Sequence, residues 1–122
     1  MSIRILKSDD GETTERTGAA IFEGGQVWAR TLASEAGVNV TVVHFAPGAR
    51  AGWHRHSGDQ VLYVVGGIGK VGDRAGEHVM SAGDCAVIPA GTDHWHGAHD
   101  TGSPMSHLSI MPAGSETTLV EA

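Results

Sequence analysis

The stretch Gly48-Ala-Arg-Ala-Gly-Trp-His54-Arg-His56-Ser-Gly-Asp-Gln60, followed by the apolar run Val61-Leu-Tyr-Val-Val65, decides the fold and places the first candidate site. His54 and His56 point to the same side of an extended segment, because successive side chains of a strand alternate sides. Gln60 begins the apolar run, which is typical of a strand. The stretch therefore predicts the larger part of a metal site carried by strands.

A second cluster lies about thirty residues later, in Gly83-Asp-Cys-Ala-Val-Ile-Pro89-Ala-Gly91-Thr-Asp-His94. A short apolar strand ends at Pro89, a Pro-x-Gly turn reverses the chain, and His94 follows on the next strand. Together the two clusters supply three imidazoles and one amide, which suit a divalent transition metal. Fewer than six protein ligands leave positions for water or substrate, and the residues alone leave the identity of the metal open.

The two clusters resemble the two sequence motifs of the cupin superfamily. The first motif is matched at Gly48, His54, His56 and Gly67, with Gln60 where a glutamate is usual. The second is matched at Gly83, Pro89, Gly91 and His94, with Ala98 where the motif ordinarily ends in asparagine. The resemblance implies an all-β fold, the antiparallel double-stranded β-helix or jelly-roll barrel of the cupins.

Within the cupins, the chain is more similar to the small single-domain bacterial proteins that include the manganese-dependent hydroxynitrile lyases, often labelled carboxymuconolactone-decarboxylase-like. This resemblance runs from about residue 38 to residue 111 and rests on Trp53-His54-Arg55-His56, His94-Trp95-His96-Gly97-Ala98 and Met105-Ser106-His107-Leu108. It implies metal ligands at His54, His56, Gln60 and His94, and proton transfer by His96 or His107. It also implies one divalent metal, with manganese favoured over zinc, iron, nickel and copper.

The rest of the chain agrees with an all-β fold, because short apolar runs alternate with glycine-rich turns at roughly ten-residue spacing. Strands are predicted at residues 26–33, 38–45, 54–56, 60–65, 68–71, 78–80, 84–88, 93–97 and 105–111, with a turn at Gly66-Gly67. The predicted organisation is an N-terminal arm over residues 1–25 with one short strand, a barrel over 26–113 and a C-terminal tail over 114–122.

The composition of the chain restricts the classes of molecule that it is expected to bind. Fourteen acidic against eight basic residues give a net charge of −6 without a Lys/Arg cluster, which argues against nucleic acid. No segment reaches the roughly 18 apolar residues of a membrane span, and the charged N-terminus does not have the pattern of a secretory signal. Cys85 is the single cysteine, which suits a reducing compartment. We therefore expect a cytoplasmic protein that binds a small-molecule substrate.

The alternation of side chains along a strand also predicts which residues face the barrel interior and which face outward. If Gln60, Leu62 and Val64 point into the barrel, Val61, Tyr63 and Val65 face outward, and this outer face is apolar too. Either the N-terminal arm or a second subunit must cover it, so a homodimer or homotetramer is expected. By the same rule Trp53 and Trp95 alternate with the ligands and point away from the metal.

Three functions are compatible with these residues. The first is a metal-dependent lyase acting on a small hydroxy or carbonyl compound, as in the cleavage or synthesis of a cyanohydrin. Gln60 favours it, because a neutral ligand set leaves the full charge of the metal available to an alkoxide. The second is a dioxygenase or oxidative-cleavage enzyme, and the third is a cupin that binds a small ligand without turnover.

Overall fold

The computed structural model describes residues 2–122, and every regular element among them is a β-strand. The strands are β1 (Thr14–Glu15), β2 (Phe22–Glu23), β3 (Val27–Glu35), β4 (Val38–Phe45), β5 (Arg50–His56), β6 (Gln60–Asp73), β7 (Gly76–Ser81), β8 (Cys85–Ile88), β9 (His94–Ala98), β10 (Met105–Pro112) and β11 (Thr117–Leu119). Over this part of the chain no helix is long and apolar enough to cross a membrane. The predicted all-β class is confirmed.

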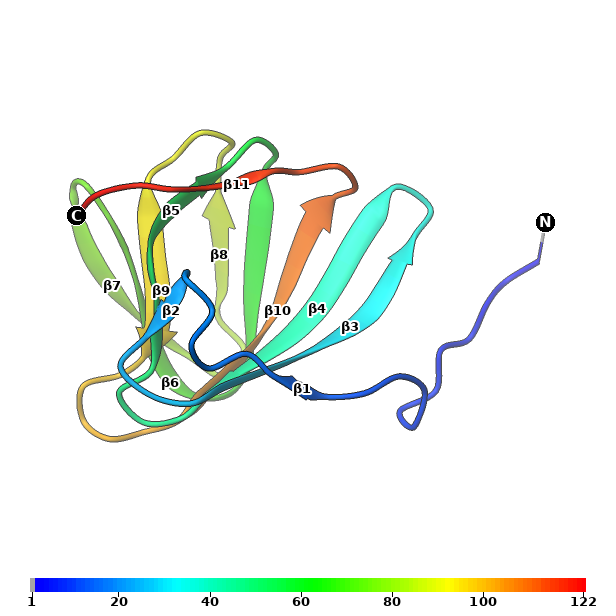
Figure 1. The fold of residues 1–122 in the computed structure, drawn as a ribbon, viewed down its shortest axis with the longest axis horizontal. Coiled ribbons are helices and arrows are strands. Elements are labelled where there is room, and N and C mark those ends of the chain that lie inside the picture. Colours follow the sequence, from blue (N-terminus) through cyan, green and yellow to red (C-terminus); the bar gives the residue numbers. More distant parts are fainter. Residues whose placement is uncertain (1) are drawn as a thin grey trace.

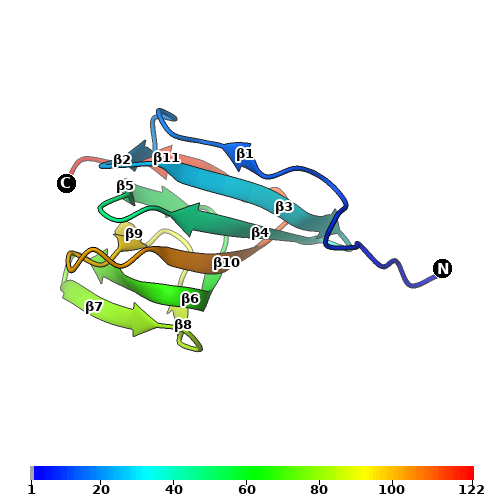
Figure 2. The same ribbon diagram turned by 90° about the horizontal axis from the view of Figure 1, so that it is seen from below.

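The strands form one strongly curled antiparallel sheet in the order β1-β3-β4-β10-β6-β9-β5-β11. In Figure 1, β10, β4 and β3 fan out on one side of the molecule, and β9, β5 and β7 lie on the other. Figure 2 shows β4, β10 and β6 stacked side by side. The first half of β6 pairs with β10 and β8, and its second half pairs with β7 and β9. The sheet therefore curls around an interior, as expected for a jelly roll.

β6 turns the corner between the two halves at Gly66 and Gly67. The turn predicted here is wrong, because the strand continues from Gln60 to Asp73. Gly67 has a φ of 75°, and a Cβ there would overlap the carbonyl oxygen of Pro104. The register with β10 shifts at the same place, between Ser106 and His107. A bulge and a glycine bend the strand without ending it, which sequence patterns cannot distinguish from a turn.

The core is built from the inward face of these strands. Gln60, Leu62 and Val64 are 3%, 0% and 0% exposed, as alternation predicts. Tyr63 and Val65 are 42% and 47% exposed on the opposite face. Complete burial of a Leu or Val side chain contributes about 1.5–3 kcal/mol, so this strand register is strongly fixed. The arm does not cover the outer face of β6, since β1 pairs with β3 instead.

Both ends of the chain add strands to the barrel. Residues of the predicted arm form β1 and β2, where one short strand was expected, and β2 pairs with β5. Residues of the predicted tail form β11, which also pairs with β5. The boundaries at residues 25 and 113 stay a prediction. Because β5 lies between β9 and β11, both of its edges are held where it carries His54 and His56.

Candidate metal centre

Three histidines from two neighbouring strands meet in the interior. His54 and His56 share the inner face of β5, and His94 on β9 is the register partner of His54. They are 1%, 6% and 1% exposed. One ring nitrogen from each lies within 4.8 Å of the others. A buried cluster of three imidazoles at this separation indicates a metal-binding site.

Each of these rings is oriented by a hydrogen bond between its Nδ1 atom and an oxygen atom of the chain. Nδ1 of His54 lies 2.6 Å from the carbonyl oxygen of Gly52, and Nδ1 of His94 lies 2.8 Å from that of Thr92. A carbonyl can only accept, so Nδ1 carries the proton and Nε2 keeps its lone pair. Nδ1 of His56 lies 2.8 Å from the hydroxyl of Thr117 on β11. Such partners orient metal-binding imidazoles in proteins.

Gln60 directs its amide oxygen at the same point. Its Nε2 donates to the hydroxyl of Ser109 at 2.9 Å, and its Oε1 lies 3.1 Å from Nε2 of His94. With the proton of His94 on Nδ1, these two atoms are both acceptors and repel each other. Nε2 of His56 is also buried without a hydrogen-bond partner within the described chain. A cation between these atoms satisfies all of them, so the donor set fits a divalent transition metal.

Burial keeps the three imidazoles neutral. It lowers the pKa of His54 and of His56 from 6.5 to about 4, and it also lowers the pKa of His94. Backbone hydrogen bonds to Gly52 and Thr92 oppose the effect at His54 and His94 without cancelling it. The lone pairs are therefore available at neutral pH without a proton first having to leave.

A second pair of histidines stands beside the triad. Nε2 of His107 on β10 lies 3.2 Å from Nδ1 of His96 on β9, and both residues are buried. Phe45 packs against both rings, with centroids 5.8 Å and 5.5 Å away. Burial lowers the pKa of His107 to about 4 and that of His96 well below its usual value. One hydrogen bond between two neutral imidazoles can hold and pass a proton.

These residues open onto an inner cavity of about 220 Å³. Its wall contains five of the six predicted site residues, His54, His56, Gln60, His96 and His107. Most of the remainder is apolar, and Arg16 from the arm is also part of the wall. The apolar lining residues are Ile21, Phe22, Ala29, Val43, Ala51 and Met111. The cavity combines a few converging polar groups with an apolar lining, which is typical of a small-molecule site.

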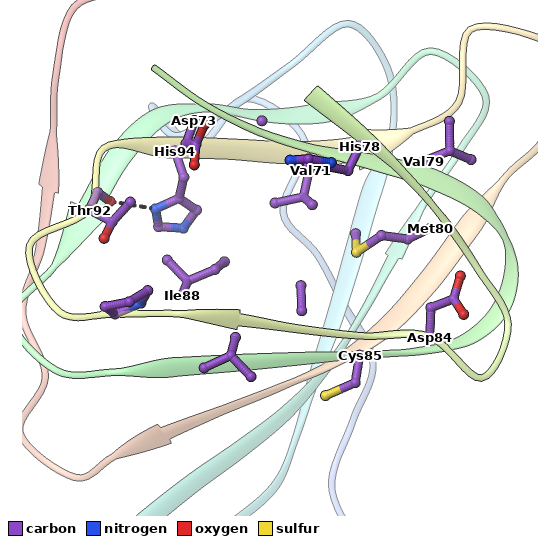
Figure 3. A pocket seen from close by; sticks show the side chains of 14 residues that line it. Val71, Asp73, His78, Val79, Met80, Asp84, Cys85, Ile88, Thr92 and His94 are labelled. Atoms are coloured by element: carbon purple, nitrogen blue, oxygen red, sulfur yellow. Dashed lines mark hydrogen bonds between the residues drawn. The ribbon is translucent and has the colours of Figure 1, made fainter. Parts of the chain in front are cut away.

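A larger cavity of about 470 Å³ lies on the other side of His94, between β7 and β8. Figure 3 shows His94 at one end of it, bonded to Thr92, with Asp84 and Cys85 at the opposite end. His94 is its single contact with the histidine cluster among the described residues. The convergence of nitrogen and oxygen atoms is in the smaller cavity, so we place the candidate site there.

Trp53 and Trp95 face away from the cluster, as alternation predicts. The guanidinium of Arg74 lies 4.0 Å from the ring centroid of Trp53, and that of Arg50 lies 4.4 Å from that of Trp95. The Trp95 ring also covers Gly72 so closely that a Cβ there would overlap it. These contacts support β5 and β9 from outside and hold their backbones in place.

All six predicted site residues are brought together by the fold, whereas Thr117, Ser109 and Arg16 were not predicted. Thr117 comes from a strand far from the motifs in sequence, and a lone hydroxyl residue gives no pattern signal. Ser109 follows His107 by two residues on β10, so alternation places both on one face, and this signal could have found it. His44 and His99 bond to Ser106 and Thr101 instead, outside the cluster.

Known proteins show the same fold. A cupin-like protein from Thermotoga maritima is 29% identical, with a TM-score of 0.82 over 93% of this chain and 90% of that one. A protein described as a sugar phosphate isomerase from a cupin superfamily, from Silicibacter pomeroyi, is 25% identical, with a TM-score of 0.78 over 98% and 83%. These likenesses span nearly the whole chain and agree with the jelly-roll topology.

Curated relatives match a shorter segment. Acireductone dioxygenase from Rhodopseudomonas palustris is 43% identical over 47 residues, which are 34% of this chain and 28% of that protein. The chain thus matches little more than a quarter of that relative's length. The family model described as the cupin domain matches residues 41–111, more than half of the chain and the segment with all six predicted site residues. Fold, buried triad and family match agree, and the chain belongs to the cupin domain family.

Proposed function

We propose that the chain is a metal-dependent lyase that cleaves or forms a carbon–carbon bond in a small hydroxy or carbonyl compound, in the manner of a hydroxynitrile lyase. The observation that carries the proposal is the pairing of two features in one buried cluster. Gln60 Oε1 faces His94 Nε2 with both atoms in need of a cation, and the neutral His96–His107 pair lies beside them. This chemistry requires two parts: a metal site that binds the hydroxyl or carbonyl oxygen of the substrate, and a group that accepts a proton.

We assign His54, His56, Gln60 and His94 as the residues that hold the metal, and manganese as the metal. When bound, a divalent metal supplies Lewis acidity toward a hydroxyl or carbonyl oxygen. Gln60 matters because three imidazoles and an amide bring no negative charge. The metal therefore keeps its full attraction for a developing oxyanion. A negatively charged glutamate at this position would weaken that attraction.

The His96–His107 pair moves the proton. In cyanohydrin cleavage, a neutral imidazole of the pair accepts the hydroxyl proton, the carbonyl forms, and the carbon–carbon bond breaks as cyanide departs. The imidazolium then returns the proton to cyanide, so that an aldehyde and hydrogen cyanide leave and the pair is neutral again. Burial against Phe45 suits this role, because a proton held there is readily given up.

The test is turnover of mandelonitrile by the manganese-loaded protein, followed by benzaldehyde absorbance in air and under argon, with metal content from elemental analysis. We expect equal rates with and without oxygen. His107→Ala lowers kcat by about 10²- to 10⁴-fold while metal content stays unchanged. His99→Ala, which removes a histidine outside the cavity, is the matched control. A purified protein that takes up no metal refutes the proposal.

Oxygen-dependent chemistry is the second candidate, and the match to acireductone dioxygenase favours it. Three imidazoles also suit iron, and open coordination positions suit oxygen. The same assay separates the two functions, because turnover of a hydroxy-ketone substrate that occurs only in air supports the dioxygenase.

We further propose that the protein is a dimer through the outer face of the β4-β10-β6-β8 half of the sheet. Tyr63 and Val65 on β6 and Val87 on β8 are 42%, 47% and 70% exposed. Val61 is the register partner of both Val87 and Ile110, so the apolar face continues across three strands. Analytical ultracentrifugation tests this: Tyr63→Glu is expected to yield a monomer, whereas Thr118→Glu on β11 leaves the mass unchanged.

A further inference from the structure

Arg16 is a solvent-exposed residue that borders the inner cavity. It lines that cavity together with the candidate ligands. It also lines a neighbouring cavity of about 390 Å³, to which Ala29 and Thr41 again contribute. The backbone is held on both sides, because Arg16 N–H donates to Val27 O at 2.7 Å and Arg16 O accepts from Ala19 N–H at 3.0 Å. The backbone of Arg16 is therefore fixed beside the cavity, and the residue is exposed to solvent.

Its guanidinium has no partner within residues 2–122, unlike those of the other five arginines. Four of these form ion pairs with carboxylates, and Arg30 bonds to the carbonyl oxygens of Ser8 and Asp10. Glu15 next to it bonds to Thr17 and Gln26. An arginine carries five donors in a planar fork that fits a carboxylate. At Arg16 these donors remain free for a ligand.

The cavity wall holds no counter-charge. Among the described residues that line it, Arg16 is the one formally charged side chain, and the histidines are neutral. Glu12 lines the neighbouring cavity and not this one. In a chain with a net charge of −6, an acid-free cavity with an arginine at its mouth attracts anions.

We propose that Arg16 binds the carboxylate of the substrate, so that the substrates are small 2-hydroxy or 2-oxo acids or their derivatives that carry a free carboxylate. The proposal rests on the assignment of the inner cavity as the reaction site and names the substrate class. Arg16 holds the carboxylate at the mouth, while the hydroxyl or carbonyl oxygen points inward to the histidine cluster. A bidentate arginine–carboxylate contact fixes the orientation of the molecule as well as its affinity.

The test uses lactate and lactamide, which share the hydroxyl and the carbon skeleton and differ in charge. Binding to the manganese-loaded and to the metal-free protein is measured by calorimetry at neutral pH. We expect the wild-type protein to prefer lactate, and Arg16→Gln to lose about 10- to 100-fold in lactate affinity with no change for lactamide. Arg16→Lys retains part of the preference. Lys7→Gln, which removes a positive charge elsewhere on the arm, behaves as wild type.

Equal affinity of the wild-type protein for lactate and lactamide overturns the proposal, and so does a lactate preference that survives in Arg16→Gln. The metal-free arm separates it from the proposed function. If the protein binds no metal and still shows an Arg16-dependent preference for lactate, the lyase assignment fails and the anion site stands. If metal binds and mandelonitrile turns over while lactate and lactamide bind equally, the lyase assignment stands and the anion site fails.

Discussion

The five histidines of the interior fall into two groups that the fold treats differently. In the triad, Nδ1 of each ring is bonded to an oxygen of the chain, and the inner nitrogens converge. His96 and His107 are instead bonded to each other. The first arrangement fixes which nitrogen keeps its lone pair at His54 and His94, whose partners are carbonyl oxygens, and the second lets a proton change places. Residues of one type, in one buried cluster, thus acquire separate roles from their hydrogen-bond partners.

Removal of a triad ring should have the largest effect. His54→Ala eliminates one of three converging nitrogens, so we expect the loss of stoichiometric manganese or zinc from the protein, measured by elemental analysis after gel filtration. His107→Ala is the matched change in the second group and should keep its metal. Retention of full metal content by His54→Ala would mean that the triad is not the site.

Loosening a ring without removing it should have an intermediate effect. Thr117→Val keeps the shape of the side chain but deletes the oxygen bonded to His56. We expect metal affinity to fall by about 10- to 100-fold in a chelator competition assay, as is usual for such orienting partners. Thr118→Val on the same strand is the control, since Thr118 makes no side-chain bond to the cluster in the described chain. Equal affinities for the two variants would contradict the role of β11.

A change of charge at Gln60 sharpens the distinction between holding metal and performing chemistry. Gln60→Glu adds a carboxylate at the cluster, so metal affinity is expected to rise by about tenfold while turnover falls. The two quantities move in opposite directions if the neutral ligand set serves Lewis acidity. Parallel changes in affinity and turnover would show that the charge of this ligand has no such role.

The smallest effect concerns the stability of the metal-free protein. The pKa values of His54 and His107 are lowered to about 4 by burial, so these rings stay neutral in the folded state while the unfolded chain takes up protons below pH 6.5. The contribution of these two rings to the free energy of unfolding is therefore complete above pH 6.5 and is lost as the pH falls toward 4. Urea unfolding should show a decline of about 1.4 kcal/mol per pH unit for each proton taken up. A flat profile between pH 7 and 5 would contradict the burial argument.

The sequence allowed much of this arrangement to be predicted because the signal is local. Fixed offsets around His54, His56 and His94 mark the motifs, and period-two alternation places Leu62 and Val64 inside. Contacts between segments that are distant in the sequence could not be predicted from such local patterns. Thr117 meets His56 only because β11 pairs with β5, and the three residues of β11 are too few for a strand to be predicted from their pattern. Gly66-Gly67 misled because glycine permits either a turn or a bulge.

The corner in β6 has a consequence for how this chain tolerates changes in length. One continuous strand carries Gln60 in one half of the sheet and, thirteen residues on, pairs Asp73 with His94 in the other. A deletion of one residue before Gly66 would exchange Leu62 and Val64 for their outward neighbours and move Gln60 out of line with the histidines. Insertions and deletions should therefore be confined to hairpins such as Ala36-Gly37, where both residues already have positive φ.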